Sequence, residues 1–141
     1  MTIGRLIEGR GDVLTCDVTT TVREAASILA DRRIGALPVM EHGQIAGIFS
    51  ERDVVYRLHE FGTDTLAMVV GQVMTAPAVT VTPDTSVMAA LSLMTRRRIR
   101  HLPVVDGGRM VGFVSIGDLV KYRIDKIESE AAAMRDYIQM A

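Results

Sequence analysis

The first third of the chain carries apolar patterns with the periods of a strand and then of a helix. The stretch Val13–Cys16 is mostly apolar and predicts a short strand. Further on, apolar residues share one helical face: Val22, Ala25, Ala26, Leu29 and Ala30. Thr21 and Glu24 have capping-box spacing, so we expect this helix to begin directly after Thr21.

Two further apolar runs predict a β-hairpin. Ala36–Met40 and Gln44–Ser50 are separated by the turn residues Glu41-His42-Gly43. Ser50 and Asp53 then have the spacing of a helix N-cap, which predicts that a second helix opens there. The order of elements in this part of the chain is therefore β-α-β-β-α.

The same pattern occurs a second time. A shift of 65 residues places Val13–Val55 on Ala78–Val120 without a gap, and more than a third of the pairs are identical. The second copy contains Asp106-Gly107, a strong hairpin signal, between its two apolar runs. A repeated unit of this kind buries its apolar face against its neighbour rather than alone, so we expect two units in one domain.

A shorter echo precedes each copy. Ile3–Leu6 resembles Val70–Val73, although these segments are out of step with the main repeat by two residues. We place the first repeat at residues 1–65 and the second at residues 66–125.

The last part of the chain, residues 117–141, predicts one long helix. Its apolar residues recur in steps of four and three: Val120, Ile124, Ile127, Ala131, Met134 and Ile138. At 1.5 Å per residue such a helix reaches about 33 Å, which is longer than one small domain needs. We expect part of this seam to contact another chain in a homodimer; the alternative is that the helix wraps its own domain.

Composition and charge narrow the class of protein. The chain has 141 residues, of which 48% are hydrophobic and 23% charged, as in an ordinary globular domain. Its net charge of −1 argues against sequence-independent binding of nucleic acid, which requires a large basic excess. The run Arg96-Arg97-Arg98 followed by Arg100 leaves a local basic patch open, although basic residues also suit a helix C-terminus.

The single cysteine, Cys16, excludes an intramolecular disulfide and a cysteine-rich zinc site. The chain shows no secretory signal at its start and no apolar run long enough to cross a membrane. We expect a cytoplasmic protein without a membrane anchor.

A family resemblance rests on several short motifs, on their order along the chain and on their duplication. In chain order the motifs are Arg33–Val39, Gly47–Asp53, Val73-Met74-Thr75, Arg98–Val104 and Gly112–Asp118. Together they resemble the CBS-domain family, and in particular the tandem pair called a Bateman module. The resemblance implies an α/β (α+β) fold of two pseudo-symmetric β-α-β-β-α repeats packed sheet to sheet. It also implies clefts between the repeats that bind AMP, ATP or NAD, and often a disc-like dimer.

The resemblance assigns ribose binding to Asp53 and Asp118, and the phosphate side to Ser50 and Ser115. A carboxylate at a helix start is able to accept both ribose hydroxyls, and helix N-termini favour anions. The spacing alone equally suits a helix cap without a ligand.

Other expected nucleotide contacts lie near the first strand and before the hairpin of each repeat: Thr15, Thr80, Gly35, Ala36, Leu37, Arg100, His101 and Leu102. Arg52, between Ser50 and Asp53, is a further expected contact. Arg52 of the first repeat is matched by Gly117 of the second, and Gly35 by Arg100. We therefore expect the two clefts to differ in affinity or in ligand.

No catalytic constellation or metal motif is evident among the three histidines and the single cysteine, so we expect no enzyme activity and no metal. The sequence favours a stand-alone, non-catalytic regulatory module that senses an adenine nucleotide and modulates an unknown partner or its own dimer. The alternatives are a constitutive dimerisation or scaffold module without ligand and, with less support, a nucleic-acid-binding protein.

Overall fold

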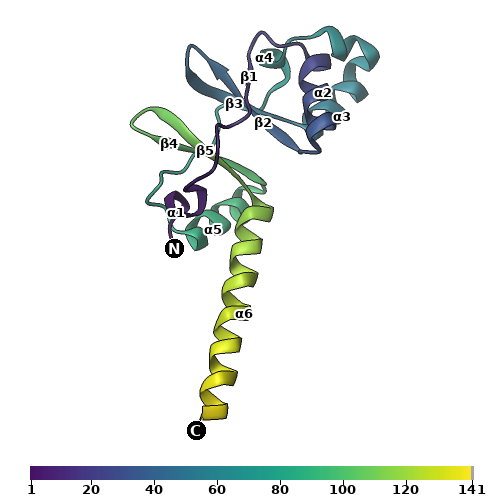
Figure 1. Cartoon of the computed structure of the whole chain (residues 1–141). Helices are drawn as coiled ribbons and strands as arrows, with labels where there is room; N and C mark the ends of the chain where they lie inside the picture. The colour runs from purple at the N-terminus through teal and green to yellow at the C-terminus, as the bar shows by residue number, and fades with distance from the viewer. Residues whose placement is uncertain (141) are drawn as a thin grey trace.

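The computed structural model describes residues 1–140 and shows two lobes with a helix that projects from one of them (Figure 1). Each lobe has one small sheet with helices packed on it. The elements follow in this order: α1 (Ile3–Ile7), β1 (Cys16–Asp17), α2 (Val22–Arg32), β2 (Ala36–Glu41), β3 (Gln44–Ser50), α3 (Glu51–Phe61), the 3-10 helix η1 (Gly62–Ala67), α4 (Val70–Val73), α5 (Val87–Arg97), β4 (His101–Asp106), β5 (Arg109–Ser115) and α6 (Ile116–Met140).

The predicted mixed α+β class and the duplicated hairpins are confirmed. Strands β2 and β3 pair antiparallel, as do β4 and β5, and both hairpins have a register shift at the same place in the repeat. The Thr21 side chain accepts a hydrogen bond from the Glu24 amide at 3.2 Å, as the predicted cap of α2 requires. The two sheets meet where β3 contacts β5.

The prediction of a strand at Val13–Cys16 is wrong in its extent. Strand β1 comprises only Cys16 and Asp17, which pair in parallel with β2. In the second repeat the equivalent residue, Val81, makes a single parallel bridge to Val104. Only Cys16 and Val81 reach the buried layer here, while Val13 and Leu14 leave the sheet and line a cavity.

The short helix before each repeat packs into the core of the other lobe. Ile3 of α1 is fully buried in the second repeat, and its amide donates to the Thr85 carbonyl at 2.8 Å. Val70 of α4 is fully buried in the first repeat, and its amide donates to the Thr20 carbonyl at 2.7 Å. Thr20 and Thr85 are equivalent positions, so the weak echo in the sequence marks a true structural repeat.

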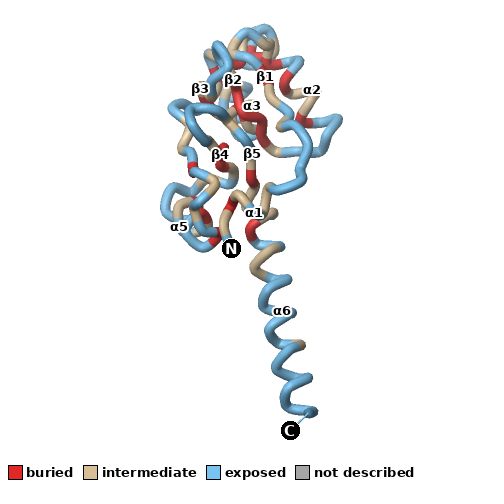
Figure 2. Tube along the Cα trace, turned by 60° about the vertical axis from the view of Figure 1, so that its left-hand side comes forward, coloured by how far each residue is buried: buried red, intermediate tan, exposed pale blue. Residues whose placement is uncertain are grey.

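Helix α6 is docked only at its beginning. Ile116, Leu119 and Tyr122 pack against the core of the second lobe. Beyond them the helix leaves the domain, and its side chains are almost all exposed (Figure 2). The predicted long C-terminal helix is therefore present. Among residues 1–140, none of the helices is both long and apolar enough to span a membrane.

Candidate functional site

Two cavities lie between the repeats. The first, called pocket 1, has a volume of about 560 Å³ and is lined by residues from both lobes. The second, called pocket 2, has a volume of about 530 Å³ and is also lined by residues from both repeats. Both volumes fall within the range of about 300–1,000 Å³ that is usual for small-molecule sites.

The two pockets are related by the sequence repeat. Equivalent positions line them, with the pocket 1 residue first: Val13/Ala78, Leu14/Val79, Arg33/Arg98, Ile34/Ile99, Gly35/Arg100, Ala36/His101, Phe113/Ile48 and Ser115/Ser50. The pockets differ where a small residue of one is replaced by a charged residue of the other. This supports the expectation that they are chemically distinct.

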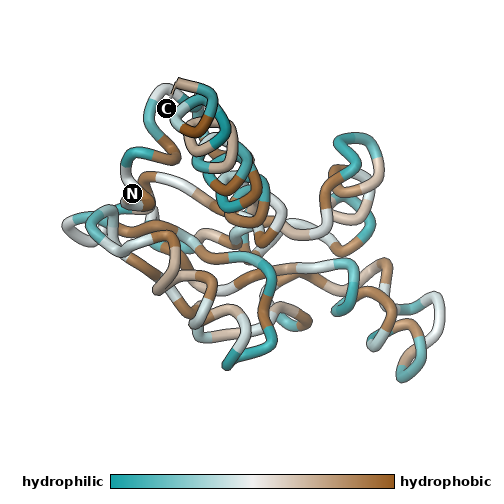
Figure 3. Tube along the Cα trace, turned by 90° about the horizontal axis from the view of Figure 1, so that it is seen from below, coloured by the Kyte–Doolittle hydropathy of each residue, from teal (hydrophilic) through white to brown (hydrophobic). Residues whose placement is uncertain are grey.

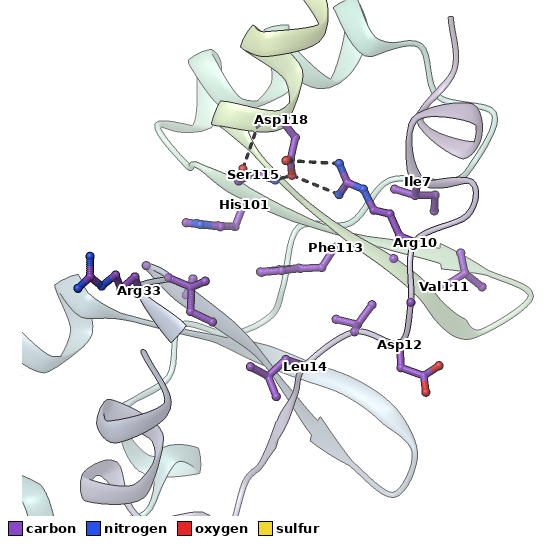
Figure 4. Close-up of a pocket in the computed structure, with 16 residues that line it drawn as sticks. Ile7, Arg10, Asp12, Leu14, Arg33, His101, Val111, Phe113, Ser115 and Asp118 are labelled. Carbon is purple, nitrogen blue, oxygen red and sulfur yellow. Dashed lines mark hydrogen bonds and ion pairs between the residues drawn. The ribbon is translucent and has the colours of Figure 1, made fainter. Parts of the chain in front are cut away.

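Asp118, in the first turn of α6, lines pocket 1. Its Oδ2 accepts from the Ser115 amide at 2.9 Å, which caps the helix. The Arg10 guanidinium reaches the same carboxylate, with Nη2 3.3 Å from Oδ1 (Figure 4). Burial alone raises the pKa of Asp118, but the Ser115 amide and Arg10 outweigh it and hold that pKa below its usual value. The carboxylate is therefore ionised at neutral pH, and its side chain is still 33% exposed.

Asp53 has the same place in the first repeat but a different environment. Its Oδ2 accepts from the Ser50 amide at 2.9 Å, and its Oδ1 accepts from the Thr75 hydroxyl at 3.0 Å. Ser50 and Thr75 line pocket 2, whereas Asp53 does not. The structure thus brings only one of the two expected ribose carboxylates to a cavity wall.

Arg33 and Arg98 end helices α2 and α5 and line the two pockets. Both have left-handed backbone conformations, with φ of 53° and 54°, a region that arginine seldom adopts. Figure 4 shows Arg33 and Leu14 of the first repeat across pocket 1 from His101 and Phe113 of the second. Each cavity therefore has one of these two exposed arginines in its lining.

His101 lines both pockets. Its ring stacks on Phe113 with a centroid distance of 5.5 Å and an interplanar angle of 12°. Burial lowers the pKa of His101, and the nearby Arg100 lowers it further, while Asp118 and Glu51 oppose them. At neutral pH the ring is therefore an uncharged aromatic surface between the cavities.

The remaining predicted site residues divide between the pockets and the cores. Ser115 and Ala36 line pocket 1, Arg52 and Arg100 line pocket 2, and Gly35 lines both. Leu37 and Leu102 line neither pocket, since their side chains are fully buried in the two cores. Thr15 and Thr80 line neither pocket as well; each directly precedes a buried residue of the sheet, Cys16 or Val81.

Sequence reasoning missed several residues of the two pockets: Arg10, Arg33, Thr75, Arg98 and Phe113. Arg33 and Arg98 carried a signal, because they are identical in both repeats at the end of a predicted helix. Arg10 carried none, because it lies 108 residues before its partner Asp118.

Metal-ligating side chains and the single thiol are the remaining candidates for chemistry. No group of three or more His, Cys, Asp or Glu side chains suited to a metal occurs within the described residues. The Cys16 thiol is buried, and burial together with the neighbouring Asp17 raises its pKa to about 11. It is therefore protonated at neutral pH, and the protonated thiol is not the nucleophilic form of cysteine.

Two interlocked repeats, with paired cavities between them and a capped helix at each, define a tandem-repeat α+β module. The chain belongs to the CBS-domain family, whose family model matches residues 7–60 and 70–125. It is similar to the CBS domain-containing protein YhcV of Bacillus subtilis, with 35% identity over 86% of this chain and 87% of that protein. It is also similar to the mitochondrial CBS domain-containing protein CBSX3 of Arabidopsis thaliana, with 37% identity over 92% of this chain but only 65% of that protein.

Solved structures share the fold. The CBS-domain containing protein ATU1752 from Agrobacterium tumefaciens has 35% identity and a TM-score of 0.81 over 86% of this chain and 92% of its own. The structure of CBSX2 in complex with AMP has 26% identity and a TM-score of 0.75, over 88% of this chain and 96% of its own. The CBS domain pair of protein MJ0100, in complex with 5-methylthioadenosine and S-adenosyl-L-methionine, has 26% identity and a TM-score of 0.78, over 89% of this chain and 98% of its own.

Proposed function

We propose that this chain is a non-catalytic regulatory module that binds an adenine nucleotide, AMP, ATP or NAD, in pocket 1. The observation that carries the proposal is the ionised Asp118 carboxylate at a helix start, on the wall of a cavity between the repeats. The adenosine-containing ligands of CBSX2 and of protein MJ0100 support it.

Each group in pocket 1 suits one part of a nucleotide. Asp118 accepts hydrogen bonds from the two ribose hydroxyls. Arg33 supplies charge for a phosphate, and the apolar Val13 and Leu14 provide a surface for the base. Arg10 already donates to Asp118, so ribose either displaces this guanidinium or shares the carboxylate with it.

Pocket 2 is proposed as the weaker site. Its carboxylate, Asp53, lies outside the cavity wall and is held by Thr75. The wall instead carries three arginines: Arg52, Arg98 and Arg100. Such a pocket favours phosphate, and although Glu51 also lines it, the pocket lacks a carboxylate at the position that Asp118 occupies in pocket 1.

Calorimetric titration with AMP, ATP and NAD tests the proposal, with Asp118→Asn and Asp53→Asn as a matched pair. Loss of charge-assisted hydrogen bonds to ribose costs about 1.5–3 kcal/mol, so Asp118→Asn should weaken the tighter site about tenfold or more. Asp53→Asn should change it less than about twofold. The reverse pattern would move the site to pocket 2, and two identical sites in the unmutated chain would contradict the asymmetry.

Thermal melting with the same nucleotides distinguishes a nucleotide-binding sensor from a constitutive scaffold that binds no ligand. A ligand at 100 times its dissociation constant adds about 2.7 kcal/mol to the stability of the folded state. A melting temperature that no nucleotide raises would favour the constitutive scaffold. Within the sensor proposal the chain is a cytoplasmic homodimer, and the bound nucleotide alters its contact with a regulated protein.

A further inference from the structure

The projecting part of α6 carries an apolar stripe that no other element within residues 1–140 covers. Exposure rises along the stripe from 41% at Val120, through 48% at Ile124 and 49% at Ile127, to 64% at Ile138. Figure 3 shows hydrophobic positions recurring along this helix between hydrophilic ones. Leu119 and Tyr122, which face the domain, lie about 100° and about 160° around the helix from the centre of the stripe.

The stripe has the heptad pattern of a coiled coil. Ile124, Ala131 and Ile138 occupy the a positions, and Val120, Ile127 and Met134 occupy the d positions. Isoleucine occupies two of the three a positions, and the d positions hold Val120, Ile127 and Met134 rather than leucine, so these core residues do not by themselves set the number of strands. In solution an exposed stripe of this length is stabilised by burial against a matching stripe.

The charged residues beside the stripe determine which second helix is electrostatically complementary to α6, and whether the two helices run parallel or antiparallel. Arg123 and Glu130 occupy g positions, and Glu128 and Arg135 occupy the e positions five residues further on. In a parallel, in-register pair, each g residue faces the e residue five places later on the other helix. Arg123 then faces Glu128 and Glu130 faces Arg135, and twofold symmetry doubles each attraction.

An antiparallel pair with full overlap of the stripe brings like charges together. In that arrangement e positions face e positions and g positions face g positions. Glu128 faces its own copy, Glu130 faces its own copy, and Lys121 faces Arg135. Within residues 1–140, neither ion pair of the structure joins two α6 side chains, so the flanking charges are free for a second helix.

We propose that α6 forms a parallel, in-register, two-stranded coiled coil with α6 of a second copy of this chain, oriented by the Arg123–Glu128 and Glu130–Arg135 pairs. This interface is independent of nucleotide binding and does not involve either pocket.

Charge-reversal variants of the full chain test the partner. The acidic variant combines Arg123→Glu with Arg135→Glu, and the basic variant combines Glu128→Arg with Glu130→Arg. Each variant alone places like charges at all four interhelical contacts, so sedimentation should show the dimer dissociation constant rising tenfold or more. An equimolar mixture should restore the dimer as a heterodimer. The control, Asp125→Arg with Lys126→Glu, exchanges charges off the seam and should leave the dimer unchanged.

Disulfide formation tests the direction. Ile138→Cys should cross-link two copies readily on oxidation, whereas the control Gln139→Cys, one residue off the seam, should cross-link slowly. In the antiparallel arrangement the two residues at position 138 lie about 27 Å apart, far beyond disulfide reach. A monomeric unmutated chain, unchanged mass in both reversal variants, no heterodimer on mixing, or equal cross-linking at both positions would each overturn the proposal.

Discussion

At the scale of single residues, His101 is the group whose state depends most on its surroundings. Burial and Arg100 keep its pKa below the usual value near 6.5, and its uncharged ring stacks on Phe113 between the two pockets. In the unfolded chain the same imidazole takes up its proton at a higher pH. Protonation therefore favours the unfolded state as the pH falls.

We expect the folded chain to lose stability as the pH falls below about 6.5, with His101 contributing to that loss until the pH passes its lower folded-state pKa. Urea denaturation at pH 7 and pH 5 gives the difference in the free energy of unfolding. His101→Gln should make this difference smaller, although it also removes the stacking at both pH values. His59→Gln, at an exposed position, should leave the difference as it is. An equal difference in all three chains would rule out the role of His101.

At the scale of elements, each hairpin contains a glycine in close contact with the segment that precedes the other repeat. Gly47 contacts the segment around Thr75, and the equivalent Gly112 contacts Ile7. A Cβ atom on Gly47 of β3 would lie 2.7 Å from the Thr75 carbonyl oxygen. The Thr75 backbone is held in place by two hydrogen bonds with the Ile48 backbone. A Cβ atom on Gly112 of β5 would lie 2.6 Å from Cδ1 of Ile7, the end of a flexible side chain. The two equivalent glycines thus have different neighbours: a hydrogen-bonded backbone beside Gly47 and a flexible side chain beside Gly112.

Gly47→Ala should therefore destabilise the chain by about 1–3 kcal/mol, the usual cost of overpacking, and Gly112→Ala by clearly less. Chemical denaturation of the two variants beside the unmutated chain measures both costs under the same conditions. Equal losses would mean that the Thr75 segment yields as easily as the Ile7 side chain.

The elements themselves were largely predictable, whereas their partners were not. Apolar period, capping residues such as Thr21 and Ser50, and the repeat located the long helices and both hairpins, because these signals are local. Strand β1 was misplaced, because an apolar run does not reveal whether it enters a sheet or a cavity wall. The distinction between Asp53 and Asp118 also escaped prediction, since it arises from Thr75 and Arg10, which are distant in the sequence.

At the scale of the whole molecule, the exchanged helices α1 and α4 tie the lobes together. Figure 1 shows α1, which precedes the first repeat, lying in the lobe of the second. Ile3 fills the core that contains Val87 and Leu102, and α4 does the same for the other lobe. The core of each lobe is therefore completed by the short helix that precedes the other repeat: α1 completes the second lobe and α4 completes the first. We expect the two lobes to unfold together.

Ile3→Ala tests this interlock near the very start of the chain, where a substitution in a frayed terminus would cost almost nothing. Removal of a fully buried isoleucine side chain typically costs about 2–5 kcal/mol, so urea denaturation should show a loss in that range. Arg5→Ala, at an exposed position of the same helix, should stay within about 0.5 kcal/mol.

Hydrogen exchange then reports how far the loss spreads. Because α1 belongs to the second lobe by contact and to the first by sequence, Ile3→Ala should lower the protection of amides in β5 and in β3 together. Faster exchange confined to β5 would show that the lobes open separately. Unchanged protection in both strands would mean that Ile3 is not part of either cooperative core, and only the combined response supports two repeats that fold as one unit.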